Sequence, residues 1–181
     1  MFKTTALAGT RLKLGKEVLW GEKEVMEQRV VLDYLIDTIK TDPQAKTQIH
    51  ATETVEAAHL EHIRTNVEFE SELGLDHWIE KLHPTPAVCG LPKDQAYNFI
   101  VKNELHSRKQ YTGVVGITNA QNAKLFVQLR CAEFDSKTKD FWIYTGGGIM
   151  HDSDINSEWQ EAENKANVML NVLSELASQR I

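Results

Sequence analysis

The chain has 181 residues, of which 41% are hydrophobic and 25% are charged, and its formal net charge at pH 7 is −6. The composition is that of a globular protein, and the acidic balance argues against nucleic acid as the main partner. Cys89 and Cys131 are too few for a disulfide framework or a zinc cluster, and no run of residues approaches the ~20 apolar side chains that span a bilayer. We therefore expect a cytoplasmic protein that forms a single domain over 1–181 and binds neither nucleic acid nor membrane.

Strand and helix patterns alternate in the first half of the chain, where the predicted elements are a strand over 2–10, a helix over 22–40, β-structure over 47–69 and a short helix over 73–82. Prolines close that short helix, and Pro92 begins another in a first-turn position where its missing N–H is tolerated. Phe99 and Ile100 are predicted to form the buried face of this next helix.

Three strands and a long helix are predicted in the second half. The strands cover 111–118, 123–134 and 141–144, with an asparagine-rich hairpin turn between the first two. The final helix covers 155–178, and the side chains expected on its buried face are Trp159, Ala162, Ala166, Met169, Leu173 and Leu176. A meander of strands with flanking helices predicts the α+β class, with a mostly antiparallel sheet.

Glu158, Glu161 and Lys165 lie on roughly one face of the final helix, at positions i, i+3 and i+7. Carboxylates one turn apart can share a magnesium ion, which takes one or two carboxylates together with substrate oxygens. The alternative is a solvated face with an ordinary ion pair between residues four apart. Spacing alone favours that second interpretation.

Three further features have both a functional and a structural interpretation. Gly146, Gly147 and Gly148 stand between a strand and the final helix, where their backbone N–H groups could approach an anion or simply form a tight turn. Arg130 lies on the polar side of its predicted strand and could bind a carboxylate or face water. His62 could transfer a proton or play a structural part.

A series of short sequence words follows in order along nearly the whole chain: LAGTR at 7–11, GEKE at 21–24, His62, HPTPAVCGLP at 83–92, YTGVVG at 111–116, LRCA at 129–132, YTGGGI at 144–149 and EWQEAENK at 158–165. Together they resemble the chorismate-binding enzymes, which include isochorismate, salicylate and anthranilate synthases. The resemblance implies a four-layered α-β-β-α sandwich, to which this chain contributes part of the layers.

The resemblance also implies a role for each matching residue. Glu22 and Glu161 look like ligands of Mg²⁺, with Glu158 supporting the metal, and His62 looks like the histidine beside the departing ring hydroxyl. Gly9 and Thr10 resemble the turn that binds the ring carboxylate of chorismate. The full set of implied substrate-binding residues is Gly9, Thr10, Tyr111, Arg130, Tyr144, Gly146, Gly147 and Lys165.

Two positions favour one branch of this family. Ala8 stands where aminodeoxychorismate synthases typically carry a nucleophilic lysine. The word His-Pro-Thr-Pro at 83–86 is typical of isochorismate synthases of menaquinone or siderophore pathways, whereas anthranilate synthases usually have a glycine-rich word there. Salicylate synthases, which share the metal site, are the nearest alternative.

The resemblance places the general-base lysine and the general-acid glutamate of the family upstream of the matched words. We therefore expect the chain to be the C-terminal portion of a chorismate-binding domain, inactive or nearly so by itself, and to form a homodimer or pair with a complementing N-terminal half. A non-catalytic chorismate-binding remnant and an interaction domain that only inherited the fold are the remaining alternatives.

Overall fold

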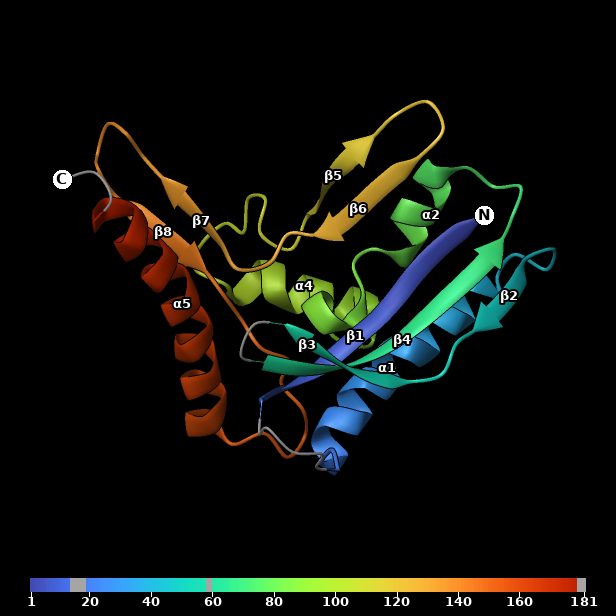
Figure 1. Cartoon of the computed structure of the whole chain (residues 1–181), viewed down its shortest axis with the longest axis horizontal. Coiled ribbons are helices and arrows are strands. Elements are labelled where there is room, and N and C mark those ends of the chain that lie inside the picture. Colours follow the sequence, from blue (N-terminus) through green and yellow to red (C-terminus); the bar gives the residue numbers. More distant parts are fainter. Residues whose placement is uncertain (14–18, 58–59, 179–181) are drawn as a thin grey trace. The chain divides into compact units, whose positions relative to one another are not determined.

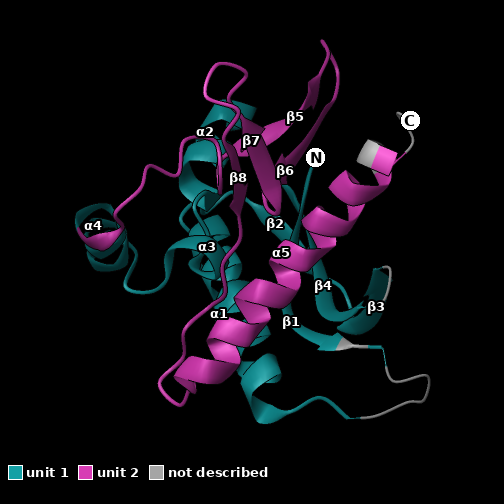
Figure 2. Cartoon of the chain, turned by 90° about the vertical axis from the view of Figure 1, so that its left-hand side faces the viewer, with its two compact units in different colours: residues 1–102 teal, residues 103–181 magenta. Residues whose placement is uncertain are grey.

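A computed structural model describes residues 1–13, 19–57 and 60–178. The chain forms two compact units, Met1–Lys102 (unit 1) and Asn103–Ile181 (unit 2), which are coloured separately in Figure 2. Each unit combines antiparallel strands with helices, so the predicted α+β class with mostly antiparallel sheet is confirmed. Among the described residues, no helix has the length and apolar character that crossing a membrane requires.

The elements of unit 1, labelled in Figure 1 except for α3, which Figure 2 labels, are β1 (Phe2–Leu12), α1 (Glu22–Ile39), β2 (Lys46–Ile49), β3 (Glu53–Ala57), β4 (Leu60–Glu70), α2 (Leu75–Leu82), α3 (Pro86–Cys89) and α4 (Lys93–Asn103). Strand β4 is the centre of its sheet: β1 pairs with one edge, and β2 and β3 pair one after the other with the opposite edge, all antiparallel. The β-structure predicted over 47–69 is therefore three strands.

The core of unit 1 lies between α1 and one face of this sheet. Along β4 every second residue is buried, because successive side chains of a strand point to opposite faces. Phe69 of β4 packs edge-on against Trp78 of α2 at 4.7 Å between ring centroids. The buried cluster consists of Ala6, Val31, Leu32, Leu35, Ile39, Val67, Phe69 and Trp78.

A bulge interrupts the pairing of β1 with β4 at Gly9. The register shifts between Ala8 and Thr10, and Gly9 has φ +72°, a left-handed conformation that side chains disfavour. A Cβ at this position would lie only 3.0 Å from the Cβ and the carbonyl oxygen of Glu24 in α1. Glycine is therefore required both by the backbone angle and by the close approach of the helix.

Unit 2 contains two separate antiparallel hairpins and a long helix: β5 (Val114–Thr118) with β6 (Ala123–Val127), β7 (Cys131–Phe134) with β8 (Phe141–Tyr144), and α5 (Ile155–Ser178). The asparagine-rich turn is confirmed, since Asn119 Oδ1 accepts hydrogen bonds from the amides of Gln121 and Asn122. The helix prediction over 155–178 is confirmed residue by residue.

One strand prediction in unit 2 is wrong. The stretch 123–134 is two strands, β6 and β7, separated by residues 128–130. Arg130 has φ +48° in this break, so it does not belong to the polar side of a continuous strand. The two halves pair with different partners, and alternation in the sequence does not show where a strand changes its partner.

Two predicted buried positions are also wrong. Phe99 of α4 is 67% exposed and Trp159 of α5 is 68% exposed, whereas Glu158 of α5 is buried. Ala162, Ala166, Met169 and Leu173 are half-buried, and the side chain of Leu176 lies outside the described residues. Helical spacing identifies which side chains share a face, but the neighbouring elements decide which face is covered.

Candidate functional site

Thr10 and His62 lie directly opposite each other on β1 and β4, so the structure brings these two predicted site residues together. The Thr10 hydroxyl and the His62 Nδ1 are 3.1 Å apart and share a hydrogen bond. His62 is half-buried and alternates with Glu61 and Ile63, which are buried on the face that packs against α1. The imidazole is therefore on the opposite face of the sheet, with its orientation fixed by Thr10.

The carboxylates at the start of α1 lie close to the Gly9 bulge. Glu22, the predicted metal ligand, is the exposed first residue of the helix, and Glu24 is half-buried two residues further on in the same first turn. It is Glu24 whose backbone and Cβ lie against Gly9. Acidic residues in a first turn are stabilised by the helix dipole, and both carboxylates have this advantage. The role of Glu22 as a metal ligand stays a prediction.

In unit 2, a cation and a carboxylate of α5 meet the glycine-rich loop. Lys165 Nζ donates to Glu161 Oε1 at 2.6 Å and to the carbonyl oxygen of Gly146 at 2.9 Å. The ion pair expected from the spacing of four residues is thus present, and the same ammonium also holds the loop. An ammonium has three N–H donors, so in the described part of the chain one donor of Lys165 remains for another acceptor.

Two carboxylates of α5 converge on Gly147. The Ser153 hydroxyl donates to Glu158 Oε1 at 2.5 Å, which fixes this buried side chain. A Cβ on Gly147 would lie 3.5 Å from Glu158 Oε2 and 3.7 Å from Glu161 Oε1. The absence of a side chain therefore leaves space in front of both carboxylates, and a cavity of about 290 Å³ lies beside Gly147 and Glu158.

This pair of carboxylates fits a magnesium ion, because Mg²⁺ takes one or two carboxylates and completes its coordination with water and substrate oxygens. The described residues contain no group of three or more His, Cys, Asp and Glu side chains that could hold a metal by themselves. Glu158 and Glu161 would therefore supply part of the coordination, and the third predicted ligand, Glu22, belongs to unit 1. The magnesium site stays a prediction.

The hydroxyl of Tyr111 lies against Gly146 of the same glycine-rich loop. A Cβ on Gly146 would lie 2.8 Å from the Tyr111 hydroxyl, so only glycine lets the phenol approach this closely. The Tyr111 ring stacks on Tyr144 of β8, with the ring centroids 5.7 Å apart. Burial raises the pKa of Tyr111, so its phenol, which is protonated at neutral pH in any case, stays protonated and able to donate to a higher pH than usual. Arg130 is half-buried in the break between β6 and β7.

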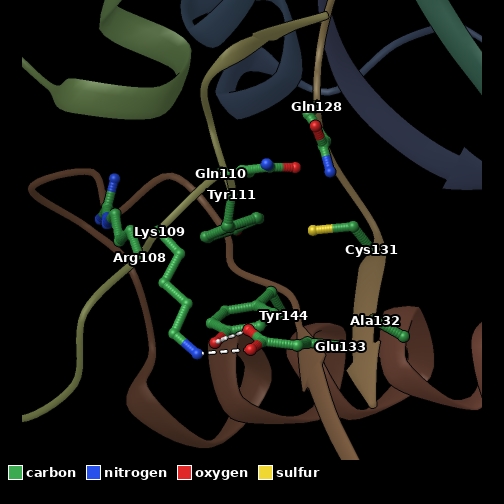
Figure 3. A pocket seen from close by; sticks show the side chains of 9 residues that line it. All are labelled: Arg108, Lys109, Gln110, Tyr111, Gln128, Cys131, Ala132, Glu133 and Tyr144. Atoms are coloured by element: carbon green, nitrogen blue, oxygen red, sulfur yellow. Dashed lines mark hydrogen bonds and ion pairs between the residues drawn. The ribbon is translucent and has the colours of Figure 1, made fainter. Parts of the chain in front are cut away.

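A second cavity of unit 2, of about 260 Å³, opens beside the two tyrosine rings (Figure 3). It lies where the segment before β5 meets β7 and β8. Its lining residues are Arg108, Lys109, Gln110, Tyr111, Gln128, Cys131, Ala132, Glu133 and Tyr144. Two predicted substrate-binding residues, Tyr111 and Tyr144, thus share one cavity with an ion pair between Lys109 and Glu133.

Comparison with known families decides to which group this arrangement belongs. A family profile described as "Chorismate binding enzyme" matches residues 2–174, which is nearly the whole chain. The chain belongs to this family. The resemblance found in the short sequence words is thereby confirmed.

Curated relatives of this chorismate-binding chain include several isochorismate synthases. Isochorismate synthase MenF of Escherichia coli is 29% identical over 174 residues, which cover 91% of this chain and 40% of the relative. Isochorismate synthase DhbC of Bacillus subtilis is 29% identical over 163 residues, covering 87% and 40% respectively. Anthranilate synthase component 1 of Neisseria meningitidis is 28% identical over 179 residues. The chain thus resembles more than one branch of the family.

A solved structure has the same fold. A crystal structure assigned to the 2,3-dihydroxybenzoate-specific isochorismate synthase DhbC of Bacillus anthracis superimposes with a TM-score of 0.81 at 25% sequence identity. The match covers 95% of this chain and 49% of that one. The chain therefore spans less than half the length of the MenF, DhbC and crystal-structure relatives.

The structure adds site residues that sequence reasoning missed. Ser153 orients Glu158, and Glu24 lies under the Gly9 bulge. Lys109 and Glu133 lie beside the predicted substrate-binding tyrosines. The close approach that a glycine permits could have pointed to Glu24. Lys109 and Glu133 depend on a contact between segments that are distant in the sequence, and Ser153 depends on the conformation of the turn before α5, so no spacing rule reveals them.

Proposed function

We propose that the chain carries chorismate-binding and magnesium-binding residues of an isochorismate synthase. The observation that carries the proposal is the convergence of Glu158, Glu161 and Lys165 on the Gly146–Gly147 loop. Carboxylates, an ammonium group and a side-chain-free backbone at one place suit a metal ion and a substrate carboxylate together. The names of relatives from several organisms support the same reaction.

The residues of unit 2 would bind the enolpyruvyl carboxylate of chorismate. The third N–H donor of Lys165 and the protonated hydroxyl of Tyr111 would each donate a hydrogen bond to this group. Arg130 has no hydrogen bond or ion pair to another described residue, so its guanidinium is available for a bidentate contact. Gly146 has no side chain that would occupy the space next to the Tyr111 hydroxyl, so a ligand carboxylate could reach this donor.

Glu158 and Glu161 would hold Mg²⁺, with Glu22 as a further ligand. The ion, when bound, neutralises the ring carboxylate of chorismate and orients it. Ser153 keeps Glu158 in position by its hydrogen bond to Oε1, which leaves Oε2 facing the space at Gly147. Gly9 and Thr10 would offer backbone donors to the same ring carboxylate, in the bulge where the strand pairing is already open.

In the proposed reaction, water adds to one ring carbon and gives a proton to a general base, the ring double bonds shift, and the allylic hydroxyl on another ring carbon takes a proton from a general acid and leaves as water. His62 would lie beside this departing hydroxyl, with its ring oriented by Thr10. Ala8 cannot act as a nucleophile, in keeping with addition of water rather than of a protein amine. Salicylate synthase chemistry, which adds elimination of pyruvate, is the second candidate because it would use the same metal-binding residues.

The test is magnesium-dependent binding of chorismate to the purified chain, measured by calorimetry, with Mn²⁺ binding by electron paramagnetic resonance as an independent readout. Glu161→Ala removes a proposed ligand and should lower the affinities for chorismate and for Mn²⁺ by about 100-fold or more. Even the loss of a residue that only hydrogen-bonds to a metal ligand typically lowers metal affinity by about 10–100-fold. Glu163→Ala is the matched control, because Glu163 is an exposed carboxylate on the same helix. It should bind as the parent chain does.

Product analysis by chromatography then separates the reactions. Isochorismate that disappears with a chelator supports the proposed branch and shows that the chain is active by itself, while salicylate with pyruvate supports the second candidate. If the parent chain binds neither Mn²⁺ nor chorismate, or if the two glutamate variants behave alike, the proposal fails.

A further inference from the structure

We propose that Lys109 and Glu133 are positioning residues that hold Tyr111 and Tyr144 in the substrate pocket. This inference deepens the proposed function and rests on it for the identity of the ligand. The placement of the two tyrosines can be tested without any ligand. Neither Lys109 nor Glu133 is expected to touch the substrate.

This pair contacts Tyr144 directly and is linked to Tyr111 through the backbone of the turn that contains Lys109. Lys109 Nζ donates to Glu133 Oε1 at 2.5 Å, and the Tyr144 hydroxyl makes a longer hydrogen bond of 3.4 Å to the other oxygen, Oε2 (Figure 3). Lys109 is two residues before Tyr111, whose amide donates to the carbonyl oxygen of Arg108 at 2.8 Å in a tight turn. The ion pair therefore joins this turn to β7 and, through Tyr144, to β8.

The backbone of the turn shows that the position of Lys109 is imposed by its surroundings. Lys109 has φ +48°, a left-handed conformation that is unfavourable for a residue with a Cβ. Such a conformation persists only where neighbouring interactions compensate for it, and it is found disproportionately at binding sites. Two interactions hold Lys109 in this conformation: its amide donates to the Ser107 hydroxyl at 3.2 Å, and its Nζ donates to Glu133.

Lys109 keeps its charge over the physiological range. The hydrogen bond to Glu133 raises the pKa of Lys109, with a smaller electrostatic contribution from the same carboxylate. Both side chains are partly exposed, 52% for Lys109 and 38% for Glu133. A partly exposed pair adds little to overall stability, so its consequence should be seen in the tyrosine positions rather than in unfolding.

The experiment labels the chain with 3-fluorotyrosine and records the ¹⁹F NMR signals, of which there are four because the chain has four tyrosines. Tyr111→Phe and Tyr144→Phe assign the two signals of interest. Lys109→Met should shift or broaden both, and Lys109→Arg, which keeps the charge and the donors, should leave them near their original positions. Chorismate affinity in the presence of Mg²⁺ should fall about fivefold in Lys109→Met, the range expected for an exposed ion pair.

A charge exchange separates the two tyrosines. Lys109→Glu combined with Glu133→Lys rebuilds the ion pair and should restore the Tyr111 signal. The Tyr144 signal should stay shifted, because its hydroxyl loses the carboxylate acceptor at position 133. Lys109→Gly tests the backbone separately: it suits φ +48° but cannot form the ion pair, so both signals should move as they do in Lys109→Met.

Lys139→Met is the matched control. Lys139 also has a left-handed backbone, at φ +66°, and also lies beside an aromatic ring, that of Phe134, in the turn between β7 and β8. Its replacement should leave the Tyr111 and Tyr144 signals and the affinity unchanged. Unchanged signals in Lys109→Met or Lys109→Gly, or equal shifts in Lys139→Met, would overturn the inference.

These results are separable from the proposed function. If the parent chain does not bind chorismate but the signals respond as expected, the positioning of the tyrosines stands and the ligand assignment is wrong. If chorismate binds but the Tyr111 and Tyr144 signals do not change when Lys109 is replaced, the proposed function stands and the positioning role is wrong.

Discussion

The two units of the chain differ in what holds their side chains in place. In unit 1 one sheet packs with α1 and α2 around a continuous apolar cluster that includes Ala6 and Trp78. In unit 2 the two hairpins form separate two-stranded sheets, and Glu158 is the only buried residue among those described. The residues that carry the proposed chemistry of unit 2 are fixed by ion pairs, hydrogen bonds and ring stacking instead.

This difference separates stability from function along the chain. A two-stranded hairpin is at best marginally stable in water unless another layer covers it. Unit 1 therefore supplies most of the apolar stabilisation among the described residues, while unit 2 supplies most of the predicted ligand-binding side chains. Substitutions of the same kind should then have different consequences in the two units.

The largest expected difference concerns two tryptophans. Trp78 in unit 1 is 2% exposed and packs on Phe69, so Trp78→Ala should lower the free energy of unfolding by about 3–5 kcal/mol. Trp159 in unit 2 is 68% exposed, and Trp159→Ala should change the free energy of unfolding by less than about 0.5 kcal/mol. Urea unfolding measures both, and similar losses would contradict the contrast between the units.

A smaller difference is expected for two glycines. Gly9→Ala places a Cβ in a left-handed conformation and 3.0 Å from Glu24, so unfolding should become easier by at least about 1–2 kcal/mol. Gly148 has nothing within 4 Å of an added Cβ, and Gly148→Ala should be close to neutral. Circular dichroism during thermal unfolding gives the comparison. A neutral Gly9→Ala would mean that the bulge can rearrange.

The smallest effect is expected at alkaline pH, in unit 2. The pKa of Tyr111 is raised by burial, and the pKa of Lys109 is raised by its bond to Glu133. A group whose pKa is higher in the folded than in the unfolded chain stabilises the fold fully at any pH below its unfolded pKa, and this contribution is lost as the pH rises further. The unfolded pKa is about 10 for tyrosine and about 10.4 for lysine. The stability of unit 2 should therefore fall above about pH 10, which the ¹⁹F NMR signal of Trp142 in the chain labelled with 5-fluorotryptophan would report.

Two variants check this pH dependence. Tyr111→Phe and Lys109→Met each remove one titrating group, and each should flatten the alkaline loss. The ¹⁹F NMR signal of Trp78 in the same labelled chain should change little over this range if unit 1 is unaffected. Equal losses in both units would show that the alkaline transition does not arise from these two groups.

The sequence predicted most elements of both units because their patterns are local. The helix over 22–40 and the final helix over 155–178 follow from apolar spacing, and the hairpin at Asn119 follows from turn chemistry. The sequence words were also sufficient to identify the chorismate-binding family, since each is a contiguous stretch whose chemistry does not depend on distant residues.

Other features were decided only by the tertiary structure. The break at Arg130 arises because β6 and β7 pair with different strands, and the exposure of Trp159 and Phe99 depends on what covers each helix. The convergence of Glu158 and Glu161 on Gly147, the Thr10–His62 hydrogen bond and the Lys109–Glu133 pair join segments that are distant in sequence. Local patterns encode which face a side chain takes, but contacts between segments depend on how strands and helices pack, and so they appear only in the folded chain.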